Sequence, residues 1–439
     1  MKFYDRKKEI VFLQNTLKKS QKSAQFTILT GRRRIGKTSL VLKAYEKETM
    51  LYFFVARKSE SDLCESFVAE IENVLNIPIL GKVKTFAELF EFLMKLSIER
   101  HFTLFIDEFQ EFSKVNKSIF SEMQRVWDLY EKQSKINLIV CSSVYSMMQK
   151  IFTNSKEPLY GRCTGQLKLR AFSPSVLKEI LNDANPKYTN EDLLALYSFT
   201  GGVAKYVQLL LDAGATTKEK MIRYIISPNS IFVNDGKNTL VEDFGRDYGK
   251  YFSILTCIAQ GHNTRSDIEA ILDTEIGGYL TNLEKDYELI KKHQPIFENT
   301  SSRNIRYQIK DVFFTFWFRF IFKYNHIVEI ENYAKLQDIV NRDYETFSGF
   351  MLERYFYDKA VEMEKYTNIG QWWDRKGFNE LDLIVADETQ KTIEFFEIKR
   401  NASRFDIDLL NKKVEVFLQK NTNLNKYKIQ KNLLSMKDM

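Results

Sequence analysis

The chain has 439 residues, a formal net charge of +7 at pH 7, 44% hydrophobic residues and 28% charged residues. This length predicts two or three domains, and the hydrophobic content is sufficient for packed cores. Only 6 prolines and 17 glycines argue against long disordered linkers. The 4 cysteines and 4 histidines are scattered, which argues against a zinc site or a disulfide framework and predicts a reducing, cytoplasmic location.

Two further patterns concern membranes and charge. The start, MKFYDRKKEI, lacks the apolar segment of a signal peptide. The most apolar run, residues 312–322, is too short to span a membrane and contains Arg319, so it predicts a buried helix and no membrane association. From Arg400 onward, nine lysines and arginines stand against four acids. Such a tail suits a polyanion such as nucleic acid, or is a solvated surface helix.

The first chemical motif is a glycine-containing loop between a strand pattern and a helix pattern. Residues 25–30 are β-rich, GRRRIGKTS follows at 31–39, and LVLKAYEK is helical in pattern. Strand, G-x-x-x-x-G-K-T and helix is the context of a phosphate-binding loop. Lys37 would reach the β and γ phosphates of ATP, and Thr38 would bind Mg²⁺. The residues predicted to bind nucleotide here are Gly31, Arg32, Arg33, Arg34, Ile35, Gly36, Lys37, Thr38 and Ser39.

A pair of acids follows at the end of a second apolar strand pattern, FTLFIDEFQEF at 102–112. Asp107 is predicted to hold Mg²⁺ through water, and Glu108 to polarise the attacking water as a catalytic residue. The alternative is a strand end with two solvated acids. With a complete phosphate loop upstream, the pattern favours a nucleotide hydrolysis site.

A third strand pattern, 136–148, is interrupted by two serines. Ser142 or Ser143 is a candidate sensor of the γ-phosphate, with Ser142 taken as the binding residue; a simple turn is the alternative. Strands that alternate with helices over about 170 residues predict a parallel sheet covered by helices on both faces.

Several segments together carry a family resemblance. FYDRKKEI, GRRRIGKTSL, FIDEFQEF, CSSVYSMM, PLYGRCTGQLKLRAFSP and FTGGVAKY occur in this order. The set, over residues 1–215, resembles the archaeal-type ATPase family, a branch of the AAA+/STAND-like P-loop ATPases. The resemblance implies an ATP-binding core with a small helical lid. It also implies that Arg162 contacts the γ-phosphate or a neighbouring subunit, and that Lys205 acts as a sensor in the lid, although the family usually has proline where Ala204 stands.

The middle of the chain has helical periodicity. Ser173 is a candidate helix cap, with Pro174 in the first turn. Residues 249–310 then suggest three helices and a β-hairpin, which resembles a winged helix. If so, the helix near Tyr279–Lys285 would be presented to a DNA major groove, and Ser301–Arg306 would form the wing. Because the charge of that helix is mixed, a packing or oligomerisation role is the alternative.

The C-terminal third places charges inside strand patterns. ELDLIVADETQKTIEFFEIKR, 380–400, predicts two strands joined by a polar turn. Residues two apart on a strand point the same way, so a hairpin brings Asp382, Glu397 and Lys399 together. Two carboxylates can hold Mg²⁺ while the lysine activates water or stabilises a phosphate, which is the set that phosphodiester hydrolysis needs. Glu353, on a preceding helical pattern, is predicted to complete the metal shell.

This constellation is similar to the PD-(D/E)xK nuclease superfamily. The DUF234-type domain that follows this ATPase family carries the same pattern, W-x-R-x-G, then E-L-D-L, then E-x-K, and the match here includes Trp373, Arg375 and Gly377. The resemblance implies a restriction-endonuclease-like α/β domain with Asp382, Glu397 and Lys399 as catalytic residues. The alternative is a nuclease-like fold that serves as a scaffold or a DNA-binding platform.

Taken together, the sequence predicts an α/β protein: a P-loop NTPase of the AAA+ type with a helical lid, a winged helix and a nuclease-like domain. The predicted boundaries are 1–170, 171–240, 245–325 and 340–439. The expected function is a Mg²⁺-dependent ATPase coupled to domains that act on DNA, in a protein able to form homo-oligomers. The alternative is a regulatory ATPase whose C-terminal domains only bind DNA or protein.

Overall fold

The computed structural model describes residues 2–244, 248–298 and 304–439. Two compact units are present: Asp5–Ala171 forms one, and Phe172–Met439 with the residues up to Tyr4 forms the other. The finer predicted division of the second unit, at 171–240, 245–325 and 340–439, stays a prediction.

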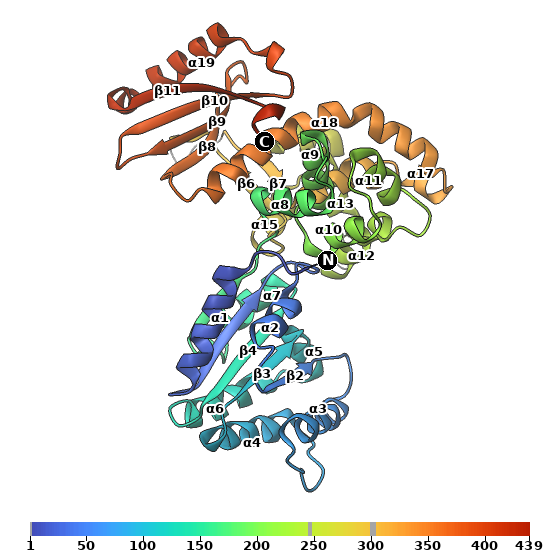
Figure 1. Cartoon of the computed structure of the whole chain (residues 1–439), viewed down its shortest axis with the longest axis vertical. Coiled ribbons are helices and arrows are strands. Elements are labelled where there is room, and N and C mark those ends of the chain that lie inside the picture. Colours follow the sequence, from blue (N-terminus) through green and yellow to red (C-terminus); the bar gives the residue numbers. More distant parts are fainter. Residues whose placement is uncertain (1, 245–247, 299–303) are drawn as a thin grey trace. The chain divides into compact units, whose positions relative to one another are not determined.

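The first unit is built on a five-stranded parallel sheet with the order β2-β3-β4-β1-β5. Strands β2, β3 and β4 of this sheet are labelled in Figure 1. The sheet confirms the predicted parallel α/β fold. Two strands were not predicted, because β2 and β5 are short and only partly buried and so leave a weak pattern. The strands are β1 Gln25–Thr30, β2 Met50–Phe54, β3 Phe102–Asp107, β4 Ile136–Ser142 and β5 Gly165–Lys168.

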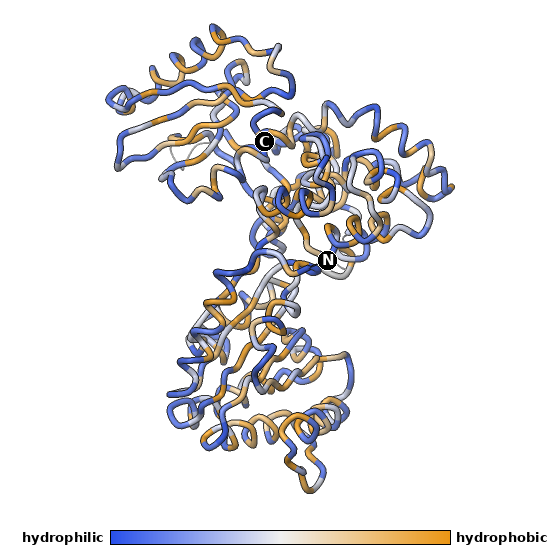
Figure 2. The backbone as a smooth tube through the Cα atoms, in the orientation of Figure 1, coloured by the Kyte–Doolittle hydropathy of each residue, from blue (hydrophilic) through white to orange (hydrophobic). Residues whose placement is uncertain are grey.

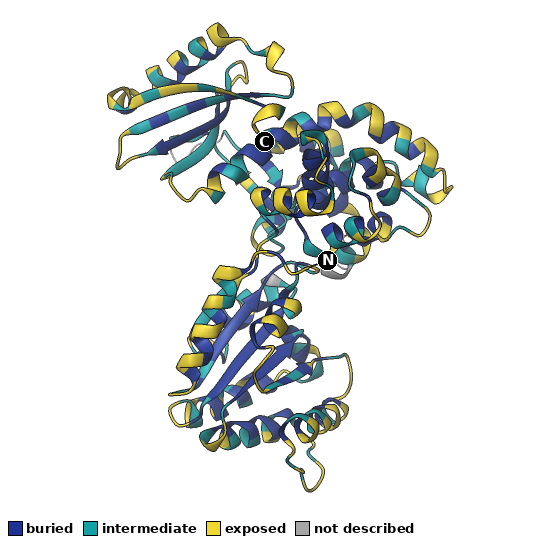
Figure 3. Ribbon diagram, viewed as in Figure 1, coloured by how far each residue is buried: buried dark blue, intermediate teal, exposed yellow. Residues whose placement is uncertain are grey.

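Helices cover both faces of this sheet, as predicted. Along β1, Phe26 and Ile28 pack with side chains of α3, α4 and α6, whereas Leu29 packs with α1 and α2 on the other face. The central strands are therefore buried on both sides (Figure 3). The helices are α1 Lys7–Ser20, α2 Lys37–Ala44, α3 Glu60–Leu75, α4 Phe86–Glu99, α5 Phe112–Val115, α6 Ile119–Tyr130 and α7 Tyr145–Thr153, with a 3-10 turn at Phe109–Glu111.

The strand order decides which loops meet. Strand β4 lies between β1 and β3, and all three run in the same direction. Their carboxyl ends therefore share one edge of the sheet, where ligands bind in open parallel sheets. The loop after Thr30, the serines after Cys141 and the acids after Ile106 are neighbours for this reason.

The second unit opens with a group of helices over the predicted lid region. Ser173 accepts a hydrogen bond from the Val176 amide at 3.5 Å, and Pro174 occupies the first turn, so the predicted helix cap is confirmed. The helices are α8 Pro174–Ala184, α9 Asn190–Thr200, α10 Ala204–Asp212, α11 Lys218–Ile225 and α12 Ile231–Phe244.

Three helices and a two-stranded antiparallel sheet follow, in the predicted order. The tip of the predicted wing, Ser301–Arg303, lies outside the described residues. The apolar run 312–322 is a buried helix, as predicted, whose second half has π-helical hydrogen bonding. The elements are α13 Tyr248–Ala259, α14 Arg265–Leu272, α15 Gly277–Lys285, β6 Ile290–His293, β7 Arg306–Ile309, α16 Val312–Phe316, the π-helix Trp317–Phe322 and α17 Asn325–Glu329.

The C-terminal part is a four-stranded sheet, order β11-β10-β9-β8, between two helices. The predicted hairpin is β9 and β10, and β11 adds a parallel strand that was not predicted. Phe395 packs against Phe417 of α19 on one face, and Leu383 and Ile398 join the core that includes α18 on the other. Figure 2 shows α19 with alternating apolar and polar colouring. The elements are α18 Tyr333–Glu362, β8 Asn368–Trp373, β9 Glu380–Asp387, β10 Thr392–Lys399, α19 Ile407–Lys420 and β11 Lys428–Ser435, with 3-10 turns at Ala402–Arg404, Thr422–Lys426 and Met436–Asp438.

Substitution of one helical glycine, Gly236, would test the packing of the second unit. A Cβ atom at Gly236 of α12 would lie 2.3 Å from the Trp317 ring, and the indole of Trp317 donates to the Val233 carbonyl at 3.0 Å. We expect Gly236→Ala to lower the free energy of unfolding by roughly 1–3 kcal/mol through overpacking. Gly349→Ala in α18, where a Cβ meets nothing within 4 Å, should instead raise it by about 0.5–1 kcal/mol. Urea unfolding measures both, and equal effects at the two positions would contradict this packing.

Candidate functional site

The phosphate-loop motif forms a tight turn between β1 and α2. Gly31, Arg34 and Gly36 have φ values of 156°, 68° and 95°. A Cβ at Gly31 would lie 2.8 Å from the Leu169 carbonyl oxygen, so the loop needs glycine there. Ile35 is buried and anchors the loop in the core beneath it, whereas Ser39 is exposed on the first turn of α2. In a turn of this kind, where left-handed and right-handed backbone conformations alternate, successive N–H groups form a concavity that binds anions.

Lys37 lies inside this loop. Its amine donates to the carbonyl oxygens of Gly31 at 2.9 Å and Arg32 at 3.1 Å. Burial lowers the pKa of Lys37 from its ordinary value, although attraction to Glu108 and Asp107 opposes that shift. Because the two carbonyl partners are neutral, the buried ammonium keeps its positive charge, and this place favours an anion.

Thr38 and Asp107 meet across the edge of the sheet. The Thr38 hydroxyl donates to Asp107 Oδ2 at 2.7 Å, and the Tyr52 hydroxyl donates to the same oxygen at 3.4 Å. Asp107 is only 6% exposed. A hydroxyl beside a carboxylate supplies the hard oxygen ligands that Mg²⁺ prefers, so these residues fit the ion.

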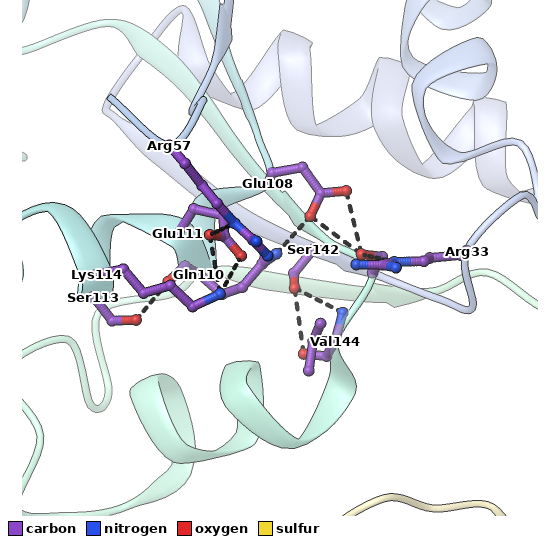
Figure 4. Close-up of polar contacts among 10 residues, drawn as sticks. Arg33, Arg57, Glu108, Gln110, Glu111, Ser113, Lys114, Ser142 and Val144 are labelled. Atoms are coloured by element: carbon purple, nitrogen blue, oxygen red, sulfur yellow. Dashed lines mark hydrogen bonds and ion pairs between the residues drawn. The ribbon is translucent and has the colours of Figure 1, made fainter. Parts of the chain in front are cut away.

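Glu108 is held among hydrogen-bond donors at the same edge (Figure 4). The Ser143 hydroxyl lies 3.2 Å from both carboxylate oxygens, and Gln110 donates to Oε2 at 2.5 Å. Arg33 of the phosphate loop donates to Ser143 Oγ at 3.4 Å. Glu108 adopts a left-handed backbone conformation with φ 54°, which is uncommon for this residue type and turns the chain sharply out of β3.

The structure separates the two candidate serines. Ser142 is fully buried, and its hydroxyl accepts from the Val144 amide at 3.0 Å and donates to the Val144 carbonyl at 3.3 Å (Figure 4). Ser143, which the sequence left as the other option, is the serine that contacts Glu108 and Arg33. The predicted role of Ser142 as a sensor stays a prediction, and its contacts are those of a turn.

The two remaining predicted positions lie elsewhere. Arg162 forms a double hydrogen bond with Asp128 of α6, at 3.1 and 3.0 Å, and donates to the Tyr160 carbonyl at 2.8 Å. Attraction to Asp128 raises the pKa of Arg162. Lys205 is exposed on α10 of the other unit. Neither implied role is tested by these contacts.

Two residues of the site were not predicted. Tyr52 comes from the weakly patterned β2, which pairs with β3 so that Phe54 lies opposite Asp107. Gln110 is fully buried in a 3-10 turn that looks like a solvated segment in sequence. Gln110 had one available signal, its position directly after the motif acids at the end of β3, whereas Tyr52 had none, because it is brought to the site only by the pairing of β2 with β3.

The second constellation lies at the end of the β9–β10 hairpin. The amine of Lys399 lies 3.2 Å from Asp382 Oδ2 and 2.8 Å from Glu397 Oε1, so the structure brings the three predicted residues together. The backbone ladder between the strands ends at Leu383 and Phe396, and the Asp382 carboxylate accepts the next amide, that of Ile398, at 2.8 Å.

A second lysine was not predicted here. Lys413 of α19 reaches Glu397 with distances of 3.2 and 3.1 Å to the two carboxylate oxygens. Burial opposes the charge on Lys399, but attraction to Asp382 and Glu397 outweighs it and raises the pKa of Lys399. Lys413 has no direct signal in the sequence, because it joins the site from a helix fourteen residues beyond the motif lysine.

Glu353 of α18 faces the same carboxylates. Burial first, and then repulsion from Asp382 and Glu380, raise the pKa of Glu353 well above its usual range. Burial and repulsion from Glu397 likewise raise the pKa of Asp382, against the attraction of Lys399. Gln371 of β8 donates to Glu353 at 3.3 Å. Mutual repulsion between carboxylates indicates that they lie near one another in a poorly solvated place.

Within residues 2–244, 248–298 and 304–439, no group of three or more histidine, cysteine, aspartate or glutamate side chains has the arrangement of a metal site. Among the described helices, none is both long and apolar enough to cross a membrane.

Comparison with known proteins agrees with the architecture. A family described as an ATPase domain predominantly from Archaea matches residues 3–210, and a family of archaeal and bacterial proteins of unknown function, DUF234, matches residues 317–413. An uncharacterized protein of Methanocaldococcus jannaschii, MJECL04, is 30% identical over 407 residues, which cover 90% of this chain and 87% of that protein. The chain belongs to the archaeal-type P-loop ATPase family with a C-terminal DUF234 domain.

Two solved structures are similar to this archaeal-type ATPase. The Walker-type ATPase PABY2304 of Pyrococcus abyssi has a TM-score of 0.55 at 19% identity, over 72% of this chain and 96% of that one. The Aeropyrum pernix ORC2 protein has a TM-score of 0.49 at 15% identity, over 70% of this chain and 90% of that one. At these identities the first likeness concerns the fold. The N-terminal part of the chain is an ATPase domain, as its family match describes.

The raised pKa of Glu353 predicts a pH-dependent stability. The folded protein holds this proton more tightly than the unfolded chain, so stability is lost as pH rises above the unfolded pKa of about 4.3. In EDTA, we expect Glu353→Gln to raise the Tm at pH 8, by about 2–4 °C for each kcal/mol gained, and to leave it unchanged near pH 4. Scanning calorimetry of this variant and of Glu388→Gln, at an exposed turn, checks it. A Tm below that of the wild type at pH 8 would rule out the proposed charge penalty.

Proposed function

We propose that the protein is a Mg²⁺-dependent ATPase of the AAA+ type whose C-terminal domain acts on nucleic acid. The observation that carries the first half is the 2.7 Å contact between Thr38 and Asp107, beside a buried Lys37. These three side chains come from two different strand ends and meet at one edge of the sheet, as phosphoryl transfer requires.

ATP binding would use the loop from Gly31 to Ser39. The phosphate oxygens would replace the carbonyl partners of Lys37, and the positive end of α2 would favour the same anion. Because Lys37 is buried, its charge is poorly solvated and gains from an anionic partner. Thr38 and Asp107 would hold Mg²⁺, which supplies positive charge at the phosphate oxygens.

Glu108 would orient and polarise the water that attacks the γ-phosphate. In the described state its two oxygens are engaged by Ser143 and Gln110, so these donors set its direction. Arg33 contacts the same serine and thereby links the phosphate loop to the catalytic acid. We propose Ser143 as the residue that senses the nucleotide, a role that its contacts favour over Ser142.

The C-terminal proposal rests on the convergence of Asp382, Glu397 and Lys399. Mg²⁺ in phosphate-processing sites is commonly held by one or two carboxylates together with substrate oxygens, so a cluster of three protein acids is not required. Asp382 and Glu397 both contact the amine of Lys399 and therefore fit such an ion. Bound Mg²⁺ would supply Lewis acidity at the scissile phosphate, and Lys399 would orient a water or hold a phosphate oxygen.

One observation favours the alternative of a domain that binds without cutting. Lys399 and Lys413 both contact Glu397, so the carboxylate already has two cationic partners. A neutralised ion-pair network of this kind suits a rigid scaffold. The three helices and hairpin of residues 248–309 would then provide the DNA contact as a winged helix, with α15 as the recognition helix.

Assembly and location remain part of the proposal. The ATPase would form homo-oligomers, with Arg162 on the exposed end of a Tyr160–Asp128 network as a candidate contact to a neighbouring subunit. The four cysteines are free, which supports the predicted reducing cytoplasm.

The catalytic role of Glu108 can be separated from nucleotide binding. We expect Glu108→Gln to reduce ATP turnover by roughly 10²–10⁴-fold, because the amide cannot polarise water, while ATP affinity stays within a few-fold. Steady-state phosphate release and equilibrium binding measure the two effects. Glu122→Gln on α6, a partly exposed acid paired with Arg125, is the matched control. Turnover by Glu108→Gln equal to that of the control would remove Glu108 from the mechanism.

Cleavage tests the C-terminal site. With Mg²⁺ or Mn²⁺ and with or without ATP, we expect the wild type to cut DNA and Asp382→Asn to lose at least about 100-fold of that rate, as loss of a metal ligand implies. Asp408→Asn, exposed on α19, controls for the charge change. Cleavage that survives Asp382→Asn would identify a contaminant, and DNA binding without cleavage by the wild type would favour the scaffold alternative.

A further inference from the structure

A cavity of about 570 Å³ opens within the second unit. Its walls come from the α13–α14 turn, the β6–β7 hairpin, the helices that follow β7, α18, and strands β8 and β9. The cavity is therefore lined both by the hairpin of the proposed winged helix and by the sheet that carries the C-terminal constellation. Both lie in one compact unit.

One wall of the cavity is acidic and belongs to the C-terminal site. Glu353, Glu380 and Asp382 line it, so the cavity reaches the carboxylate proposed to act on a phosphodiester. Glu380 accepts from Arg306 of β7 at 2.7 Å, which ties the sheet to the hairpin at this point.

The remaining walls carry Lys291, Arg319 and Arg354 against one carboxylate, that of Asp267. Arg306 and His293 also line the cavity, but Arg306 pairs with Glu380, and burial lowers the pKa of His293 to about 4, so neither adds free positive charge at neutral pH. Two of the first three have structural partners, since Arg354 donates to the Ile309 carbonyl at 2.8 Å and Arg319 donates to the Ala259 carbonyl at 3.1 Å. Carbonyl partners leave the positive charge of a guanidinium uncompensated. The walls away from Glu353, Glu380 and Asp382 therefore carry a net positive charge, which favours an anion.

Lys291 is the most informative of these residues. Among the described residues, no carboxylate lies within ion-pair distance of its amine, which instead lies 5.0 Å from the centre of the Tyr357 ring. Burial, reinforced by Arg354, lowers the pKa of Lys291 to about 8, against the attraction of Asp358. A half-buried lysine with an aromatic neighbour and no carboxylate within ion-pair distance is a place where an anion gains most.

Aromatic side chains complete the lining. Phe350 of α18 is 56% exposed and Tyr357 lies beside Lys291, so these two rings are available to a ligand. Trp373 is only 2% exposed, and the Arg306 guanidinium covers its ring at 4.3 Å. Basic groups that follow a backbone, together with aromatic rings on which bases stack, are the features of single-strand binding sites.

We propose that this cavity binds an unpaired segment of nucleic acid, with a backbone phosphate at Lys291 and bases against the aromatic wall, and presents the next phosphodiester to Asp382. The inference deepens the proposed nucleic-acid function and rests on it. The volume supports unpaired substrate, because about 570 Å³ is in the range of roughly 300–1,000 Å³ that suits small-molecule ligands. Such a space holds one or two nucleotides, whereas a base-paired duplex is too wide to enter.

The neighbouring lysine provides a matched control. Lys292 adjoins Lys291 on β6, but successive side chains of a strand point to opposite faces, and Lys292 pairs with Glu284 at 2.7 Å.

In EDTA, which prevents cleavage, fluorescence anisotropy would compare a labelled single-stranded DNA oligonucleotide, RNA of the same sequence and the DNA duplex. We expect the wild-type chain to bind a single strand more tightly than the duplex. Lys291→Met should weaken single-strand binding by about ten-fold, because one charged phosphate contact is lost. Lys292→Met should weaken single-strand binding by less than about two-fold.

A second measurement uses the wild-type chain and does not depend on a variant that folds. Brief acetylation followed by peptide mass spectrometry should show that the single strand protects Lys291 and leaves Lys292 as reactive as before. Equal binding of single strand and duplex, equal effects at the two lysines, or no binding at all would overturn the inference. Binding that follows these expectations while the cleavage assay is negative supports the cavity and rejects only the nuclease proposal.

Discussion

A carboxylate buried at the end of a strand must be met by a donor or a cation, and both candidate sites are built on that requirement. Asp107 is 6% exposed and Asp382 is 8% exposed. The first is met by the hydroxyls of Thr38 and Tyr52, and the second by Lys399 and the Ile398 amide. Without these partners the burial of either charge would cost several kcal/mol. Both folds hold such a carboxylate at a sheet edge, which is where the proposed phosphate and metal would bind.

The same requirement explains why the two sites differ. In the ATPase domain, the side chains that donate to Asp107 and Glu108 at these contacts are neutral hydroxyl and amide groups, so a cation added there displaces no ammonium group from them. In the C-terminal domain, Glu397 already has two lysine partners. Metal would have to compete with these ammonium groups, or come together with a phosphate that draws the lysines away. This contrast is the physical reason why a metal ion should bind the ATPase site more readily than the C-terminal site.

Sequence patterns predicted the motif-bearing elements and missed those whose role depends on tertiary contact. The strands of Gln25–Thr30, Ile136–Ser142 and the β9–β10 hairpin were expected because buried strands and polar turns have clear local signatures. Strands β2, β5, β8 and β11 are partly exposed, and their patterns are weak. Lys413 and Gln110 enter the sites only through packing, and the choice between Ser142 and Ser143 depended on which side of the β4 end each faces. No local pattern encodes these facts.

The claim on which the account depends most is that the loop around Lys37 binds ATP with Mg²⁺. Calorimetric titration of ATP into the full chain, with Mg²⁺ and with EDTA, tests it on the wild type and on Lys37→Ala. The account predicts saturable binding that is tighter with Mg²⁺ and at least about 100-fold weaker in the variant, because a buried charged contact worth roughly 3 kcal/mol is lost. ATP affinity that is unchanged in Lys37→Ala would contradict it.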